Sequence, residues 1–453
     1  IKMYQSGHFF GLISAFNPYL TENVVVLKNG TSAMYGDGVS SIIDMQSSNT
    51  ISENFSGGTG LNMINVDAFG KIPIGKKIEL QLSARRSVTD LIKTPTYDQY
   101  FKRIFQDTDF TNNPGGNENS ISKNERFYFY DVTAKLLYNI TKKDKLRFRF
   151  LNIYNKIEYQ EQSRINDVSE VLNSNLIQRN LATGIEYLRT WKPTFSTTAQ
   201  IYVSNYSLDA TNFDVLNNQR LIQENEVLDT GIKLHYDYVI NDRFSLFGGY
   251  QFTEVGISNL EDVNNPVFRR FVKEVIRTHA VFNELKFSSS TKNTEARIGL
   301  RANYFQKFSK TLIEPRFSFS QRFFNFFRLE ILGELKSQTS SQIIDLQNDF
   351  LGVEKRRWIL SNETTIPILK SKQLSAGIHF KKNKLLISAE AHIKDVDGIT
   401  TRSQGFQNQF QFVNAIGSYR VKGIDFLVQK QFSIFNTWFS YSYSTNDYIF
   451  KTL

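Results

Sequence analysis

Apolar and polar residues alternate with a period of two along most of this chain. The pattern is clearest from Arg126 to Ile140, from Arg297 to Tyr304 and from Lys384 to Lys394. In the last segment, the apolar positions are Leu385, Ile387, Ala389, Ala391 and Ile393. A period of two places successive side chains on opposite faces of a β-strand. The pattern therefore predicts an all-β protein whose strands have one apolar and one strongly polar face.

The length of these strands separates two all-β architectures. A soluble β-sandwich also alternates, but its strands usually have about five or six residues. The segments here run for about ten residues or more, which is the length of a tilted strand that crosses a bilayer. Aromatic residues also gather near strand ends, for example at Tyr128, Tyr130, Trp191 and Trp438, as they do at a water–lipid boundary. We therefore predict a transmembrane antiparallel β-barrel.

The predicted connections alternate between short and long. The short ones are Pro73–Lys77, Thr141–Lys145, Lys192–Pro193, Asn241–Arg243, Thr291–Asn293 and Lys381–Asn383. The long polar ones are Ser87–Asn124, Tyr159–Asn175, Asp209–Glu224, Asn259–Phe271, Gln338–Lys372 and Val396–Ser418. Outer-membrane barrels have short periplasmic turns and longer extracellular loops. We expect roughly seventeen strands from about Asn54 onward, with the long connections outside the cell.

Composition narrows the function classes. The 453 residues carry a net charge of +10 and no cysteine, and 14% of them are aromatic. Lysine and arginine are spread along the chain, so no nucleic-acid partner is expected. No apolar run reaches the length of about 18 residues that a transmembrane helix needs. The sequence has no Gly-x-Ser-x-Gly, His-Glu-x-x-His or close histidine pair, so we expect no enzyme, no metal site and no cofactor.

One stretch near the start has a different organisation. Asn23 to Asn49 shows a short apolar run, a corner at Asn29-Gly30, a second corner at Gly36-Asp37-Gly38 and another strand-like run. Asn-Gly and Asp-Gly tolerate positive φ, so two tight turns between two strands are expected. A hairpin of any globular domain would show the same pattern.

The sequence of this stretch resembles the end of the plug domain of TonB-dependent outer-membrane receptors. The residues at matching places are Lys28, Gly30, Tyr35, Gly36 and Gly38. Later segments also resemble barrel strands of this family in order: "LSARRSVTDLI", "EPRFSFS", "LLISAEAHIKDVDGIT", and "VKGIDFLVQKQF" followed by "TWFSYSYS". The first of these is typical of the Bacteroidetes receptors. The resemblance extends over essentially the whole chain.

This resemblance implies both an architecture and a function. Residues 1–50 would be the end of a plug domain, and residues 51–453 an outer-membrane barrel of the 22-stranded type, so a chain incomplete at both ends is expected. The implied function is uptake of a scarce, bulky solute across the outer membrane of a Gram-negative bacterium, driven by TonB and its inner-membrane energising complex. Two alternatives stay open. One is a non-transporting barrel subunit of an outer-membrane assembly, with a surface lipoprotein or with secretion or insertion machinery, and the other is a passive porin.

Arginines on the polar strand faces are the remaining candidate site residues. They are Arg85, Arg147, Arg149, Arg297, Arg301 and Arg316. Inside a barrel, such side chains must pair with carboxylates or face water. Two interpretations are open: a structural network between plug and barrel, and attraction of an anionic solute.

Overall fold

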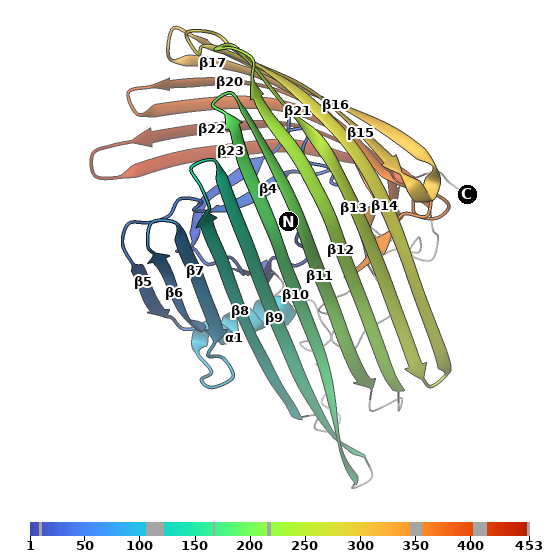
Figure 1. Cartoon of the computed structure of the whole chain (residues 1–453). Helices are drawn as coiled ribbons and strands as arrows, with labels where there is room; N and C mark the ends of the chain where they lie inside the picture. The colour runs from blue at the N-terminus through green and yellow to red at the C-terminus, as the bar shows by residue number, and fades with distance from the viewer. Residues whose placement is uncertain are drawn as a thin grey trace.

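The chain folds into one large antiparallel sheet curved into a barrel (Figure 1). The computed structural model describes residues 1–8, 11–105, 122–165, 168–214, 219–344, 356–401 and 415–450. In these residues the sheet has 17 strands, which confirms the predicted fold class. They are β5 (Ser56–Leu61), β6 (Asn65–Ile74), β7 (Ile78–Ser87), β8 (Ser122–Asn139), β9 (Asp144–Ile165), β10 (Val168–Lys192), β11 (Phe195–Asp214), β12 (Gln219–Val239), β13 (Phe244–Asn264), β14 (Val267–Ser288), β15 (Thr294–Phe305), β16 (Lys310–Phe323), β17 (Phe327–Gln338), β20 (Leu369–Lys382), β21 (Leu385–Thr400), β22 (Ile416–Gln431) and β23 (Asn436–Phe450).

The junction between the first and last strands differs from the others. The strand order is that of a closed barrel, in which β5 follows β23. Consecutive strands from β5 to β23 pair residue by residue, but the described residues of β23 and β5 share no register. An odd number of alternating strands would make these two parallel, so they cannot continue the antiparallel ladder. The register is the more direct description of pairing, and β23 is exposed along nearly its whole length. The barrel therefore has a seam between β23 and β5.

In the part of the sheet that has the length of a bilayer crossing, the two faces reverse the polarity of a soluble protein, whereas the inner face of the long extensions is largely apolar. On β12, Asp229 points inward and is 2% exposed, whereas Ile232 and Leu234 point outward and are 41% and 46% exposed. On β15, Arg301 points inward at 4% and Ile298 outward at 63%. A bilayer requires an apolar outer wall, and a barrel lumen tolerates polar side chains. The alternation predicted from sequence therefore places the polar faces inside.

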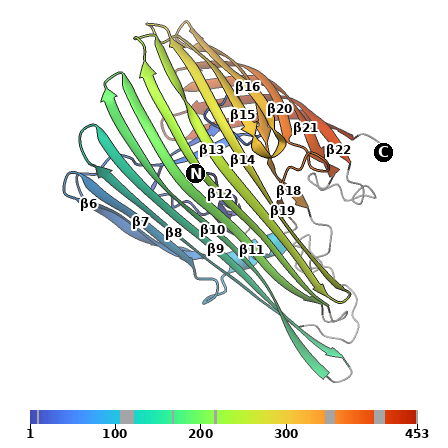
Figure 2. The ribbon, with the colours of Figure 1, turned by 45° about the vertical axis from the view of Figure 1, so that its right-hand side comes forward.

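Three segments that the sequence predicts to be loops are mostly β-strand. Most of Tyr159–Asn175 and Asp209–Glu224 belongs to β9–β12, and Asn259–Phe271 belongs to β13 and β14 except for its turn. These strands have 20 to 25 residues, about twice the length that crosses a bilayer. Beyond the membrane the outer face meets water, so polar side chains enter it beside apolar ones while the period of two continues. That polarity made the extensions resemble loops, but they are long hairpins projecting from one rim (Figure 2).

Two other predicted loops contain regular structure. Ser87–Asn124 includes α1 (Pro95–Phe105), which Thr94 caps by accepting the N–H of Tyr97 at its hydroxyl oxygen, 3.2 Å away. Gln338–Lys372 includes β18 (Ser340–Ile344) and β19 (Arg356–Leu360), which pair with each other. Over the described residues, no helix has the length and apolar character needed to cross a membrane.

Residues 1–50 lie inside the barrel, and we call them the lumenal segment. It contains β1 (Gly7–His8), β2 (Ile13–Ser14), β3 (Thr21–Leu27) and β4 (Ile42–Ser47). Its side chains reach opposite walls: the Tyr4 hydroxyl donates to Asp229 of β12 at 3.0 Å, and the Asn29 amide lies 3.1 Å from the hydroxyl oxygen of Ser375 on β20. The N-terminus lies inside the outline of the barrel in both views (Figures 1 and 2). The lumen is therefore occupied by the chain's own beginning.

Candidate functional site

The predicted motif of the lumenal segment is a loop between two paired strands. β3 and β4 pair as the sequence predicts. Both predicted corners are present, because Gly30 has a φ of +59° and Asp37 a φ of 50°. A Cβ added at Gly30 would also lie 3.0 Å from Cδ2 of Leu332. Glycine is therefore needed there both for backbone conformation and for space. We call residues 28–38 the latch loop.

Two buried glutamates of the wall accept backbone amides of the latch loop. Glu334 of β17 accepts the N–H of Thr31 at 2.8 Å and the hydroxyl of the same residue at 2.6 Å. Glu284 of β14 accepts the N–H of Ala33. Glu284 and Glu334 are 1% and 2% exposed. Hydrogen bonds to a buried charged group are stronger than neutral ones, at about 1.5–3 kcal/mol each.

Two buried guanidinium groups donate to carbonyl oxygens of the same loop. Nη1 of Arg301 lies 3.2 Å from the carbonyl oxygens of both Ala33 and Met34. Nη1 of Arg316 donates to the carbonyl oxygen of Ser32. The wall therefore binds consecutive peptide groups of the loop at both their donors and their acceptors.

Neighbouring wall residues hold these guanidinium groups in place. Arg301 donates from Nε to Oδ1 of Asn303 at 2.7 Å and from Nη1 to Oε1 of Gln251 at 3.0 Å. Arg316 donates from Nη2 to Oε2 of Glu314 at 2.9 Å. Two wall residues therefore orient the guanidinium group of Arg301 and one orients that of Arg316, so that further N–H groups of each point to the loop.

The two remaining motif glycines have different surroundings. A Cβ at Gly36 would lie 2.6 Å from Cζ of Arg301. A Cβ at Gly38 would have no atom within 4 Å, although the N–H of Gly38 donates to the carbonyl oxygen of Ser337 at 3.0 Å. Space is therefore restricted at Gly36 and free at Gly38.

The polar side chains of the motif make looser contacts. Lys28 is 66% exposed and lies 3.6 Å from a carboxylate oxygen of Asp425. Tyr35 donates its hydroxyl to Asp44 at 3.2 Å. Burial, together with the charge and hydrogen bond of Asp44, raises the pKa of Tyr35 to about 12. Tyr35 therefore stays a neutral donor at physiological pH.

Asp37 ties the end of the latch loop to the barrel. It pairs with Lys2, and its Oδ1 accepts the N–H and the hydroxyl of Thr339 at 2.7 and 2.8 Å. Burial acts to raise the pKa of Asp37, but the ammonium group of Lys2 and the Thr339 hydrogen bonds outweigh it and lower the pKa. The carboxylate is therefore the stable form in this structure.

A second attachment lies where the lumenal segment leaves for the first barrel strand. Nζ of Lys135 donates to the carbonyl oxygens of Ser47 and Ser48 at 3.1 and 2.6 Å. Nη2 of Arg147 donates to the carbonyl oxygen of Asn49 at 3.0 Å. The chain is thus held at its backbone in two separate places.

The structure places all six predicted arginines against an acceptor. Arg85 pairs with Asp131 at 2.6 Å and donates to the carbonyl oxygen of Ser14, while Arg149 pairs with Glu186 at 3.1 Å. Like Arg85, the other four bind backbone carbonyl oxygens of the lumenal segment: Arg147, Arg297, Arg301 and Arg316. The contacts of these four and of Arg85 join the lumenal segment to the barrel wall.

Sequence reasoning missed the acidic and amine partners. Glu284, Glu334 and Lys135 lie on inward strand faces, which the period of two could have indicated, but nothing local marks them. Glu314 stands directly before Pro315 and Arg316 in the quoted "EPRFSFS" segment. The sequence therefore places it near Arg316, but does not indicate that it binds the guanidinium group of that residue. His8, 2.9 Å from Asp131 through Nε2 and fully buried, also had no sequence signal.

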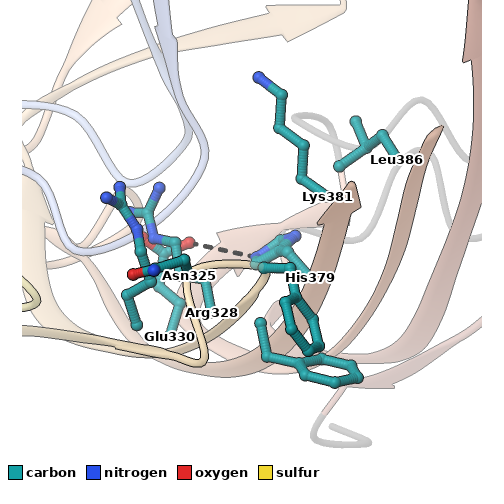
Figure 3. A pocket seen from close by; sticks show the side chains of 9 residues that line it. Asn325, Arg328, Glu330, His379, Lys381 and Leu386 are labelled. Atoms are coloured by element: carbon teal, nitrogen blue, oxygen red, sulfur yellow. Dashed lines mark hydrogen bonds and ion pairs between the residues drawn. The ribbon is translucent and has the colours of Figure 1, made fainter. Parts of the chain in front are cut away.

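A separate cavity of about 370 Å³, lined by both charged and apolar side chains, lies beside the turn between β16 and β17 (Figure 3). Glu330 lies there between Arg328, whose Nη2 is 2.8 Å from Oε1, and His379, whose Nε2 is 3.6 Å from Oε2. Lys381 also lines the cavity, and its side chain extends away from the Glu330–His379 pair (Figure 3). In the part of the chain that the structure describes, no three His, Cys, Asp or Glu side chains gather as a metal site.

Comparisons with known proteins bear on the fold. No family model and no curated protein sequence matches the chain. Solved structures do match. The ferric citrate transporter FecA in its unliganded form has a TM-score of 0.63 at 10% identity, over 97% of this chain and 67% of that one. The copper transporter OprC has a TM-score of 0.62 at 10% identity, over 95% and 68%. The FrpB iron transporter from Neisseria meningitidis has a TM-score of 0.61 at 14% identity, over 96% and 69%.

These likenesses extend over nearly the whole of this chain, and the proteins named are transporters and not enzymes. The fold of this chain is that of the TonB-dependent outer-membrane receptors, as its sequence motifs predict.

Proposed function

We propose that this protein is a TonB-dependent transporter of the outer membrane of a Gram-negative bacterium. The observation that carries the proposal is the latch loop, whose successive peptide groups are bound by buried charged groups of the barrel wall. A pore that conducts passively has no use for such a blocked lumen. A gated transporter needs one, because the block must hold until energy is supplied.

In this proposal residues 1–50 are the end of a plug domain and residues 51–453 belong to the barrel. The solute binds from outside, and TonB, with its inner-membrane energising complex, moves the plug. The contacts of Arg147, Arg297, Arg301 and Arg316 support the structural interpretation of these residues over attraction of an anionic solute. The structurally similar proteins are transporters of copper, iron and ferric citrate, so metal-bearing solutes are the first to test.

The test compares uptake in host cells with and without TonB. Cells that express the protein are offered limiting copper or ferric chelates, and uptake is expected only when TonB is present. Uptake that persists without TonB would contradict the proposal. In a planar bilayer the purified protein should not conduct, whereas a passive porin would.

The alternative is a non-transporting barrel in an outer-membrane assembly, with a surface lipoprotein as a possible partner. The long hairpins β9–β14 favour it, because they offer a large outer surface. Deletion separates the two functions. Loss of growth on one limiting nutrient supports transport, while general envelope failure without a nutrient defect supports the assembly.

A further inference from the structure

The part of β14 next to its turn with β13, from Val267 to Arg277, has one free edge. β14 pairs with β13 over its whole length, from Val267 to Phe287. Its pairing with β15 ends at Thr278, which lies opposite Phe305. The β13–β14 hairpin therefore continues past the end of β15 by eleven residues, or roughly 35 Å of strand at about 3.3 Å per residue (Figure 2).

The pairing pattern shows which peptide groups face the free edge. The N–H of Ser288 donates toward β13, to the carbonyl oxygen of Arg243 at 2.8 Å, and the N–H of Ser289 donates toward β15, to that of Thr294 at 2.9 Å. The β13–β14 register has no shift, and hydrogen-bonded positions alternate along an antiparallel strand. Odd-numbered residues of β14 therefore point their N–H and C=O groups away from β13. Between Val267 and Thr278, no described strand pairs with these N–H and C=O groups.

The side chains along this edge are exposed. Val267 is 88% and Phe271 61% exposed, and Phe268 and Val272 follow at 44% and 37%. Residues 267 to 273 are all exposed. Exposed apolar side chains beside unpaired backbone groups are the features of a strand that accepts another strand.

The charges at this edge are mainly positive. Lys273 and Arg270 have no acidic partner within 4 Å among the described residues. Nε of Arg269 lies 3.7 Å from Oδ2 of Asp262, which is a weak contact. Asp262 already pairs with Arg220 at 3.2 Å. A second copy of this edge would therefore be repelled, whereas an acidic strand would be attracted.

We propose that the free edge of β14 from Val267 to Lys273 binds an extended acidic segment of a partner protein as an added β-strand. Backbone hydrogen bonds to the odd-numbered residues give the binding, and the lysine and arginine side chains select acidic residues. The site lies on a hairpin beyond the membrane-length part of the barrel, so it stands whether or not the protein transports a solute.

The test uses the full chain in lipid nanodiscs and a labelled peptide of alternating Glu and Val, with binding measured by fluorescence anisotropy. The acidic peptide should bind, and its Lys–Val counterpart should not. A peptide of the same acidic sequence, N-methylated at every residue, keeps the charge but cannot donate backbone hydrogen bonds along either edge. It should bind at least tenfold more weakly.

A matched pair of variants tests the edge itself. Both Lys273→Ala and Lys273→Pro remove the charge, but only the proline removes an N–H that points to the free edge. Lys273→Pro should bind at least tenfold more weakly than Lys273→Ala, and unchanged circular dichroism shows that the barrel is intact. Equal binding by both variants, or by the N-methylated peptide, would mean charge attraction alone and overturn the proposal. Concentration-dependent dimerisation that Lys273→Pro abolishes would assign the edge to a second copy and also overturn it.

Discussion

Gly36→Ala should loosen the latch loop, and Gly38→Ala should not. The added methyl group of the first variant would lie 2.6 Å from Cζ of Arg301, so the guanidinium group must move. Moving the end of a flexible side chain costs little by itself. Here, however, the guanidinium group of Arg301 is buried and donates to the carbonyl oxygens of Ala33 and Met34 at 3.2 Å. Its displacement therefore breaks charged hydrogen bonds. The loss of one such bond is worth about 1.5–3 kcal/mol.

Hydrogen exchange of the amides in residues 28–38 measures this loss. At about 1.4 kcal/mol per tenfold change, exchange by local opening should become about 10- to 150-fold faster in Gly36→Ala. Gly38→Ala adds the same methyl group where no atom lies within 4 Å, so it should exchange like the unmodified protein. Peptides from β12 provide the internal reference. Equal acceleration in both variants, or in neither, would refute the assignment of Arg301 as the residue that fixes the loop.

Two further predictions concern the carboxylates. Glu334→Gln keeps the shape but removes the charge that accepts two bonds from Thr31, so the free energy of opening the latch loop should fall by about 1.5–3 kcal/mol. Glu330→Gln on the same strand should leave exchange in the loop unchanged, and a matching effect there would contradict the assignment. The pKa of Asp37 is lowered from its ordinary value of 3.8. Its pairing with Lys2 should therefore stabilise the loop fully above pH 3.8 and be lost as pH falls through the lower, folded-state value. Pepsin cleavage of residues 28–38, relative to that of the denatured chain at each pH, should show this step, and an identical profile in Asp37→Asn would exclude it.

The sequence was sufficient for features that depend on neighbours in the chain. The period of two is a local property, so it predicts the strands and their inward faces without knowledge of the barrel. The corner at Gly30 follows from the Asn-Gly pair itself. The same local reasoning failed at Asn259–Phe271, because a strand whose outer face meets water and a loop both contain many polar residues. Only pairing with a neighbouring strand distinguishes the two.

Features that depend on distant strands could not be predicted. Arg301 meets Gln251 because β13, β14 and β15 pair in particular registers, and no local pattern sets these. His8 reaches Asp131 across the lumen only once the barrel has curved around the lumenal segment. For the same reason the inward arginines were found while their acceptors were not: the face of a strand is a local property, and what lies opposite is not.

The order of the latch contacts along the chain has a mechanical consequence. Arg297 binds the peptide oxygen of Gly30, Glu334 binds Thr31, Arg316 binds Ser32, and Glu284 and Arg301 bind Ala33. Because these contacts involve backbone groups in sequence order, a pull on one end of the loop loads them one after another. Each hydrogen bond then costs about 1.5–3 kcal/mol to break, instead of the sum of all the bonds at once. A lumen closed in this way resists thermal opening, which needs many bonds to break together, yet yields to a directed force that breaks them in turn.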